Sequence, residues 1–216
     1  MTAMRTAKFK RTAAACLALL GWAALALGYI RFAGAMSAQN ISLTEASIRF
    51  LSFFAIQANI LTALVLTAFA LRTGPEEWLV HPFVRSAVCA YILLVGLIYV
   101  TMLRPTEPVE SATSFNIIVM HDLMPVAYLV FWLTCVRKAG LRWYDPLLWT
   151  IYPLFYLGFI LVRGKLSGFY PYPFIDARTL GYAGVAANTA GLLAVCAAIG
   201  MVLVVIGWAL SRRKPS

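Results

Sequence analysis

Polar side chains that could do chemistry stand inside long apolar runs of this 216-residue sequence. His121 is the only histidine within such a run, since His81 falls between two runs. A neutral imidazole accepts a proton near neutral pH, and a serine hydroxyl such as that of Ser52 is a weak nucleophile that needs such a base. Amide groups can donate hydrogen bonds to the oxyanion formed by attack. These residue types are the parts that acyl transfer requires.

Four further residues complete the candidate set, because polar groups are costly inside a membrane and are often functional there. They are expected to act as oxyanion donors or substrate contacts, with the two asparagines as the preferred donors: Asn59, Asn188, Asp122 and Tyr182. Pro125 has no N–H, so the carbonyl of His121 loses its usual helical partner. The alternative interpretation of His121 is a hydrogen bond that merely joins two helices.

Other chemistries lack their residue patterns. A haem between two histidines needs a second intramembrane histidine, and no HExxH, GxSxG or glycine-rich phosphate loop occurs. No CxxC pair is present, and all four cysteines fall within apolar runs: Cys16, Cys89, Cys135 and Cys196. We interpret them as small core residues. The sequence therefore predicts no bound metal and no cofactor.

The composition indicates the setting of these residues. Hydrophobic residues make up 62% of the chain and charged residues 12%, whereas a soluble domain has about a quarter charged residues. The mean hydropathy is +0.83. The net charge of +10 is carried by short clusters between the apolar runs rather than by one patch. This distribution favours a membrane protein over a nucleic-acid-binding protein.

Six apolar runs approach the length of about 20 residues that crosses a bilayer as a helix. They cover about 12–32, 50–71, 84–103, 115–136, 146–162 and 183–210. Backbone polar groups must be satisfied within lipid, so helices are the only reasonable structure for such runs. We predict an all-α fold in which residues 1–216 form a single transmembrane domain of six helices.

Orientation follows from the basic residues, which concentrate on the cytoplasmic side of membrane proteins. Twelve fall on the side of both termini: Arg5, Lys8, Lys10, Arg11, Arg72, Arg85, Arg137, Lys138, Arg142, Arg212, Arg213 and Lys214. Six fall on the other: Arg31, Arg49, Arg104, Arg163, Lys165 and Arg178. Both termini are therefore expected in the cytoplasm, most simply across a bacterial inner membrane.

The first apolar run also resembles a secretory signal, because Ala33-Gly34-Ala35 is similar to a cleavage site. Its length of roughly 20 residues exceeds the usual 7–15 of a signal peptide, which favours an uncleaved anchor. With this topology the second, fourth and sixth helices all start on the outer side. Ser52, His121, Tyr182 and Asn188 then lie at similar depth, and we expect them to share an outward-opening cavity.

Three segments, in order, resemble a known family: residues 50–60, residues 116–125, and residues 170–176 followed by Gly181-Tyr182. They are similar to the bacterial Pr-six-Pr six-span membrane proteins. These resemble in turn the eukaryotic androgen-induced transmembrane proteins, which hydrolyse fatty acid esters of hydroxy fatty acids. The resemblance implies that Ser52 and His121 match an essential threonine and histidine. Serine replaces that threonine here, and the histidine-to-proline spacing is one residue shorter.

Together these observations predict an intramembrane esterase of the serine or threonine type that acts on lipid esters. Ser52 is the expected nucleophile and His121 the expected general base. The expected partner is a membrane lipid or a lipid-like substrate, and no nucleic acid is expected. The alternative is a non-catalytic lipid-binding or small transport protein in which the same polar groups only shape a cavity.

Overall fold

The computed structural model describes residues 2–71, 79 and 81–212 of the chain. Every regular element in this part of the chain is a helix. Six helical segments are long and apolar enough to cross a membrane: Thr6–Ser37, Phe54–Leu71, Pro82–Thr106, Phe115–Cys135, Asp145–Ser167 and Ala177–Arg212. The protein is thus an all-α, multi-pass integral membrane protein.

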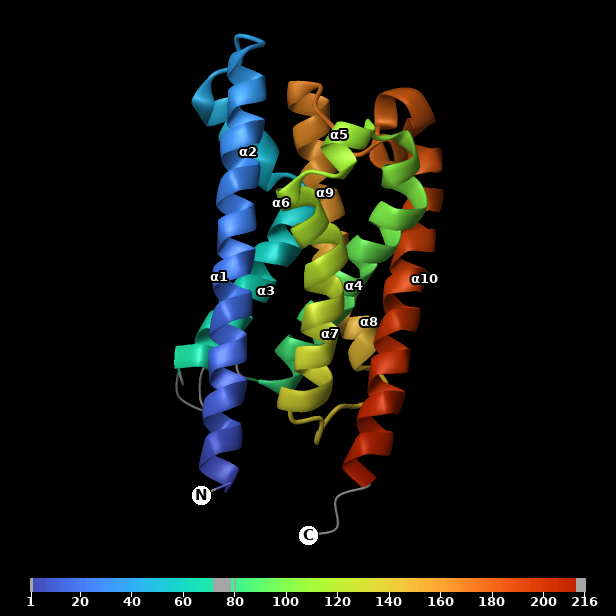
Figure 1. Cartoon of the computed structure of the whole chain (residues 1–216). Helices are drawn as coiled ribbons and strands as arrows, with labels where there is room; N and C mark the ends of the chain where they lie inside the picture. Colours follow the sequence, from blue (N-terminus) through green and yellow to red (C-terminus); the bar gives the residue numbers. More distant parts are fainter. Residues whose placement is uncertain (1, 72–78, 80, 213–216) are drawn as a thin grey trace.

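The α-helices follow one another as α1 (Thr2–Ser37), α2 (Leu43–Leu51), α3 (Phe54–Leu71), α4 (Pro82–Ile98), α5 (Val109–Ala112), α6 (Phe115–Ile118), α7 (Met124–Cys135), α8 (Asp145–Trp149), α9 (Ile151–Ser167) and α10 (Ala177–Arg212). Two segments are π-helical: η2 (Tyr99–Leu103) continues α4, and η4 (Val119–Leu123) precedes α7. Two others are 3-10 turns, η3 (Arg104–Thr106) and η5 (Pro173–Ile175). The long helices alternate in direction, so α1 begins and α10 ends at the same end of the bundle (Figure 1).

Local sequence explains several helix ends. At the start of α2, the Ser42 hydroxyl accepts a hydrogen bond of 3.2 Å from the backbone N–H of Glu45, a serine–glutamate spacing typical of helix caps. His81 caps α4 in the same way, because its Nδ1 accepts from the N–H of Phe83 at 3.2 Å. Gly168 ends α9 with a φ of 69°, a left-handed conformation that favours glycine.

Helix α4 forms the centre of the bundle, because it packs against α3, α7 and α10. Helix α1 packs mainly along α3, and α9 and α10 lie at the periphery (Figure 1). Both peripheral helices leave large apolar side chains exposed, among them Leu154, Phe155, Phe159, Val202 and Val205. Such a surface suits contact with lipid.

The spanning segments differ from the apolar runs at several ends. The run from residue 50 to 71 contains a break, because α2 ends at Leu51 and α3 begins at Phe54. The unbroken run predicts one helix that holds both Ser52 and Asn59. In the structure Asn59 lies in α3 and Ser52 lies before it. The fifth and sixth segments are longer than their apolar runs, since polar ends such as Arg163 and Lys165 stay helical. Within α10, Gly181 forms a kink with a φ of 66°.

The described residues of the larger basic group lie at the end of the bundle where α1 begins and α10 ends. Arg72, Arg213 and Lys214 are outside the described residues. Two members of the group are buried rather than exposed in loops. The Nε of Arg85 donates to the carbonyl of Leu79 at 3.2 Å, and the ammonium of Lys138 donates to three carbonyls at the end of α7: Trp132, Leu133 and Val136.

Candidate functional site

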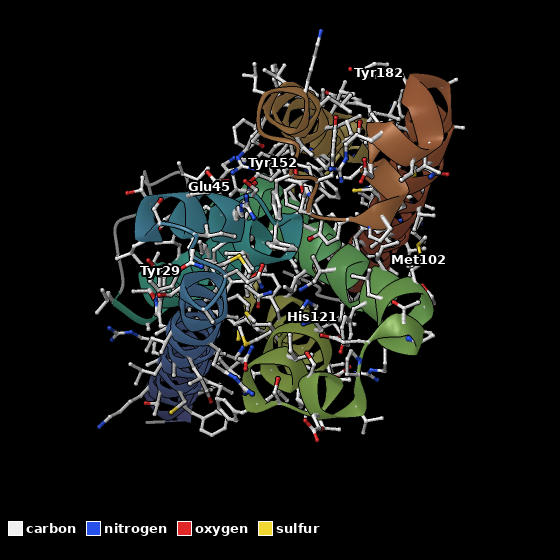
Figure 2. The ribbon with its side chains drawn as sticks, turned by 90° about the horizontal axis from the view of Figure 1, so that it is seen from above. Tyr29, Glu45, Met102, His121, Tyr152 and Tyr182 are labelled. Carbon is white, nitrogen blue, oxygen red and sulfur yellow. The ribbon has the colours of Figure 1, made fainter. Side chains whose placement is uncertain are left out.

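His121 lies in the π-helical segment η4, directly before α7, and such segments are frequent at functional sites. The residue is 8% exposed, and Figure 2 shows it toward the middle of the bundle. Its Nδ1 lies 3.1 Å from the carbonyl oxygen of Ile117, a contact that requires a hydrogen on Nδ1. The neutral ring then carries its lone pair on Nε2. This is the tautomer in which Nε2 can accept a proton.

Tyr99 fixes the plane of the imidazole. The two rings stack with centroids 4.3 Å apart and an angle of 30° between their planes. The Tyr99 hydroxyl donates to Glu107 at 2.8 Å, and the Arg104 guanidinium lies 4.9 Å from the centre of the tyrosine ring. Tyr99 opens the second π-helical segment, η2, so the two π-helical segments meet through these two rings.

Gly96 permits this close approach of α4 to η4 and α7. A Cβ atom at position 96 would lie 3.0 Å from Cγ of Pro125 and 3.1 Å from the carbonyl oxygen of His121. Both distances are shorter than ordinary van der Waals contact, so a methyl group at this position would push its neighbours away by a few tenths of an ångström. The carbonyl freed by Pro125 thus faces the backbone of α4.

His121 contributes to the walls of two cavities. The smaller, about 90 Å³, is almost wholly apolar and lies between α3, α4, α9 and α10. Its other lining residues include Phe54, Leu94, Val95, Ile98, Leu157 and Leu193, with Thr189 as a polar group from α10. A cavity with such walls suits an acyl chain rather than a polar solute.

The larger cavity, about 790 Å³, is more polar and opens near α2, α5 and α6, at the end of the bundle away from α1's start. Aromatic and aliphatic side chains form part of its wall, and charged and hydroxyl groups line the rest: Arg31, Thr106, Glu107, Glu110, Ser111, Ser114 and Asn116. Four residues line both cavities: Ala55, Leu103, His121 and Tyr172. His121 therefore stands where an apolar chamber meets a polar one.

Ser52 occupies the break between α2 and α3 and is 1% exposed. Its hydroxyl donates to the carbonyl of Ile48 at 2.6 Å, and its own carbonyl accepts from the Tyr156 hydroxyl at 2.9 Å. Ser52 is not among the residues that line either cavity, and none of the hydrogen bonds between described residues joins it to His121. The structure does not bring the two predicted catalytic side chains into contact.

Side chains from distant segments satisfy the backbone at this break. The Tyr172 hydroxyl accepts from the N–H of Ala55 at 3.1 Å, and the Gln57 amide donates to the carbonyl of Leu51 at 2.9 Å. Burial raises the pKa of the Tyr172 phenol above its usual value, so the hydroxyl stays protonated. Irregular backbone at membrane depth needs such partners. They hold Ala55 and Tyr172 in the shared cavity wall.

The preferred oxyanion donors are already committed elsewhere. Asn59 is fully buried, and its amide nitrogen donates to the carbonyl oxygens of Ala55 at 2.9 Å and Met120 at 3.2 Å. Asn188 is exposed, and its amide donates to the carbonyl of Phe174 at 2.9 Å. Neither lines either of the two cavities described above. Both asparagines hold the fold together in this structure.

Asp122 and Tyr182 also lie away from the cavity walls. Both carboxylate oxygens of Asp122 accept hydrogen bonds from the guanidinium of Arg104, which ties η4 to the start of η3. Tyr182 is 60% exposed and lies at the edge of the bundle (Figure 2). Of the six candidates from the sequence, His121 alone lines the cavities.

Several residues that line the cavities were not predicted from the sequence as site residues. Tyr99 and Glu107 reach the site because η2 and the turn after it fold back toward η4. Arg31 entered only as one of the basic residues that set orientation. A tyrosine near the end of an apolar run is typical of a membrane interface, so its pairing with His121 had no sequence pattern to reveal it.

Comparison of the chain with known protein families, with characterised proteins and with solved structures finds no match.

Proposed function

We propose that this membrane protein binds an amphipathic lipid ester in the two joined cavities and hydrolyses its ester bond. The observation that carries the proposal is the placement of His121, whose Nδ1 is held by Ile117 and whose ring lines both cavities. A lipid with its acyl chain in the apolar cavity and its polar part in the larger one would present its ester near this ring. Three segments resemble the bacterial Pr-six-Pr proteins, which resemble in turn the eukaryotic lipid ester hydrolases, and this resemblance adds support.

In the proposed reaction, Nε2 of His121 accepts the proton of an attacking hydroxyl. The oxygen forms a bond to the acyl carbon, and the carbonyl electrons move to the oxygen to give a tetrahedral oxyanion. Collapse breaks the ester bond, and the leaving alkoxide takes the proton back from the imidazolium. The attacking group is either water, which releases the acid directly, or Ser52, which gives an acyl-enzyme that water then hydrolyses.

Ser52 serves as nucleophile only after a local rearrangement. Its hydroxyl must leave the carbonyl of Ile48, now 2.6 Å away, and turn toward the cavity wall formed by Ala55. The backbone of Ser52 is held by Tyr156, Ile48 and Arg49, so this rearrangement has to be a rotation of the side chain alone. A water molecule needs no rearrangement, since the polar cavity is open.

A second candidate function is lipid binding without chemistry. It is favoured by the engagement of Ser52 with Ile48 and by the committed amide of Asn59. In this case the polar groups shape the cavity and the protein carries or senses a lipid. We further propose that both termini face the cytoplasm and that the membrane is a bacterial inner membrane.

The experiment that separates the two functions uses purified full-length protein and a panel of lipid esters. Fatty acid released from each ester is measured by mass spectrometry, and bound lipid is measured in parallel. Release above the rate of protein-free micelles supports the hydrolase. Binding of the esters without release from any of them would contradict hydrolysis and leave the lipid-binding function.

A further inference from the structure

One cation and two carboxylates line the larger cavity, and two of these three side chains, Arg31 and Glu110, are exposed and so mark its mouth. Arg31, near the end of α1, contributes the cation, and Glu107 and Glu110 contribute the carboxylates. The buried and half-buried part of the lining is apolar and includes Phe32, Phe50, Phe53, Ile56 and Met120. A molecule that fills this cavity must place apolar groups inward and charged groups at the mouth.

Glu107 is already satisfied by neighbouring hydroxyl groups. One of its carboxylate oxygens accepts from Ser111 at 2.6 Å, and the other accepts from Tyr99 at 2.8 Å. The role of Glu107 is thus to hold the turn after η3 against the Tyr99 ring. Its carboxylate is the less available of the two acids to a ligand.

Arg31 and Glu110 are far less engaged. The hydrogen bond found for the Arg31 side chain among the described residues is a long one, 3.3 Å from its Nη1 to Oδ1 of Asn116. The carboxylate of Glu110 has no hydrogen bond in the same part of the chain. The ion pairs found between described residues are Arg49–Glu45, Arg104–Asp122, Arg163–Glu45 and Arg178–Asp176. Opposite charges thus line one cavity without pairing with each other.

The charge pattern discriminates between lipid classes. An anionic lipid would leave the carboxylate of Glu110 beside a negative charge, and an uncharged lipid would give neither ion a partner of opposite charge. A zwitterionic head group matches both. Its phosphate oxygens accept from the guanidinium fork of Arg31, and a primary ammonium donates N–H groups to the carboxylate of Glu110.

We infer that the mouth of the larger cavity binds the head group of an amine-bearing zwitterionic phospholipid, with the phosphate on Arg31 and the ammonium on Glu110. The inference deepens the proposed function and rests on its lipid-binding part, since it names the class of lipid that enters the cavities. The acyl chains then extend past the Phe50 and Phe53 rings toward His121. The head group specifies the lipid, and the apolar cavity accepts its chain.

The test is native mass spectrometry of the detergent-purified full-length protein with four lipids of identical acyl chains: phosphatidylethanolamine, phosphatidylcholine, phosphatidylglycerol and diacylglycerol. We expect phosphatidylethanolamine to bind most tightly. Arg31→Gln should remove the preference for both phosphatidylethanolamine and phosphatidylglycerol over diacylglycerol. Glu110→Gln should weaken phosphatidylethanolamine by roughly fivefold while phosphatidylglycerol gains or stays unchanged. Lys165→Gln, a cation outside the cavity lining, is the matched control and should change nothing.

The outcomes separate this inference from the proposed function. If the wild-type protein binds all four lipids equally, the head-group site is wrong although lipid binding stands. Equal binding of phosphatidylcholine and phosphatidylethanolamine would refute the hydrogen bond from the ammonium to Glu110. If none of the four lipids binds, the head-group site is wrong, and the proposed function is then decided separately by the panel of lipid esters. Tight phosphatidylethanolamine binding without hydrolysis supports the head-group site and contradicts only the enzyme.

Discussion

At the scale of single residues, the proposed hydrolysis depends on the imidazole of His121, whose surroundings fix its tautomer. Ile117 holds Nδ1 and Tyr99 stacks against the ring. The sequence pointed to His121 because one histidine in an apolar run is costly unless it has a role. The sequence could not show that the Asn59 amide is already hydrogen-bonded, because its second acceptor is the carbonyl of Met120, which lies far away along the chain.

Ser52→Ala and Ser52→Thr distinguish serine from water as the attacking group. If Ser52 is the nucleophile, alanine abolishes labelling by a fluorophosphonate probe and ester hydrolysis. Threonine keeps a hydroxyl but adds a methyl group that restricts χ1, so partial activity is expected. Labelling and fatty acid release are measured at matched protein amounts. Unchanged turnover in Ser52→Ala would assign the attack to water.

At the scale of the helices, long apolar runs gave the spanning segments, because the lipid core sets both their length and their hydropathy. The break at Ser52 and Phe53 was not predictable from the run around it. It is stabilised by hydroxyl groups of Tyr156 and Tyr172, from segments more than a hundred residues later. The π-helical form of η4 had only an indirect indication, the proline that follows His121.

Gly96→Ala tests whether the close contact of α4 with η4 shapes the site. The new methyl group would meet Pro125 and the carbonyl of His121, so these groups must move apart by a few tenths of an ångström. We expect a loss of about 1–3 kcal/mol in unfolding free energy, as for overpacked cores, together with reduced hydrolysis. Gly158→Ala in α9 is the matched control, since nothing lies within 4 Å of its added Cβ. Equal stability of the two variants would argue against the contact.

Glu45 should make the attachment of α2 depend on pH. Hydrogen bonding to Arg49 is the main cause that lowers the pKa of this carboxyl, and Arg163 also contributes. A lowered pKa in the folded state means that the stabilisation is present at neutral pH. It is lost as the pH falls through that lowered pKa.

Thermal unfolding of wild type and Glu45→Gln, followed from neutral to acidic pH, checks this prediction. The wild-type protein should lose more stability than the variant on acidification, and the two should converge at the acidic end. Glu110→Gln is the control, because Glu110 has no ion pair among the described residues. Parallel curves for wild type and Glu45→Gln would show that Glu45 does not anchor α2.

At the scale of the whole molecule, six spanning helices place both termini on one side, and the unequal distribution of basic residues predicts that this side is the cytoplasm. Reporter domains fused after Ser216 and inserted between Arg104 and Ser114 should report opposite sides of the membrane. In Figure 1, α1 begins and α10 ends at one end of the bundle, and α5, which lies between Arg104 and Ser114, is at the other end. Reporters on the same side would contradict the six-span topology.

The proposed function is inferred from the two cavities that share part of their lining, and these cavities are formed by the whole bundle. Their shared wall draws on η2, α3, η4 and the segment before η5. No apolar run in the sequence identifies these neighbours, because contacts between helices depend on tertiary packing. The packing of these elements explains why one buried histidine can line both an apolar cavity and a more polar one.

The role of His121 as the general base is tested most directly by comparing ester hydrolysis by purified His121→Gln with that by the wild-type protein. Glutamine can still donate an amide N–H toward the carbonyl of Ile117, but it cannot take up a proton. If His121 is the general base, fatty acid release by the variant falls to the level of protein-free micelles. Lipid binding should be retained, and the unfolding free energy should change by no more than about 2 kcal/mol. Release at the wild-type rate from the folded variant would contradict the role of His121 as the base.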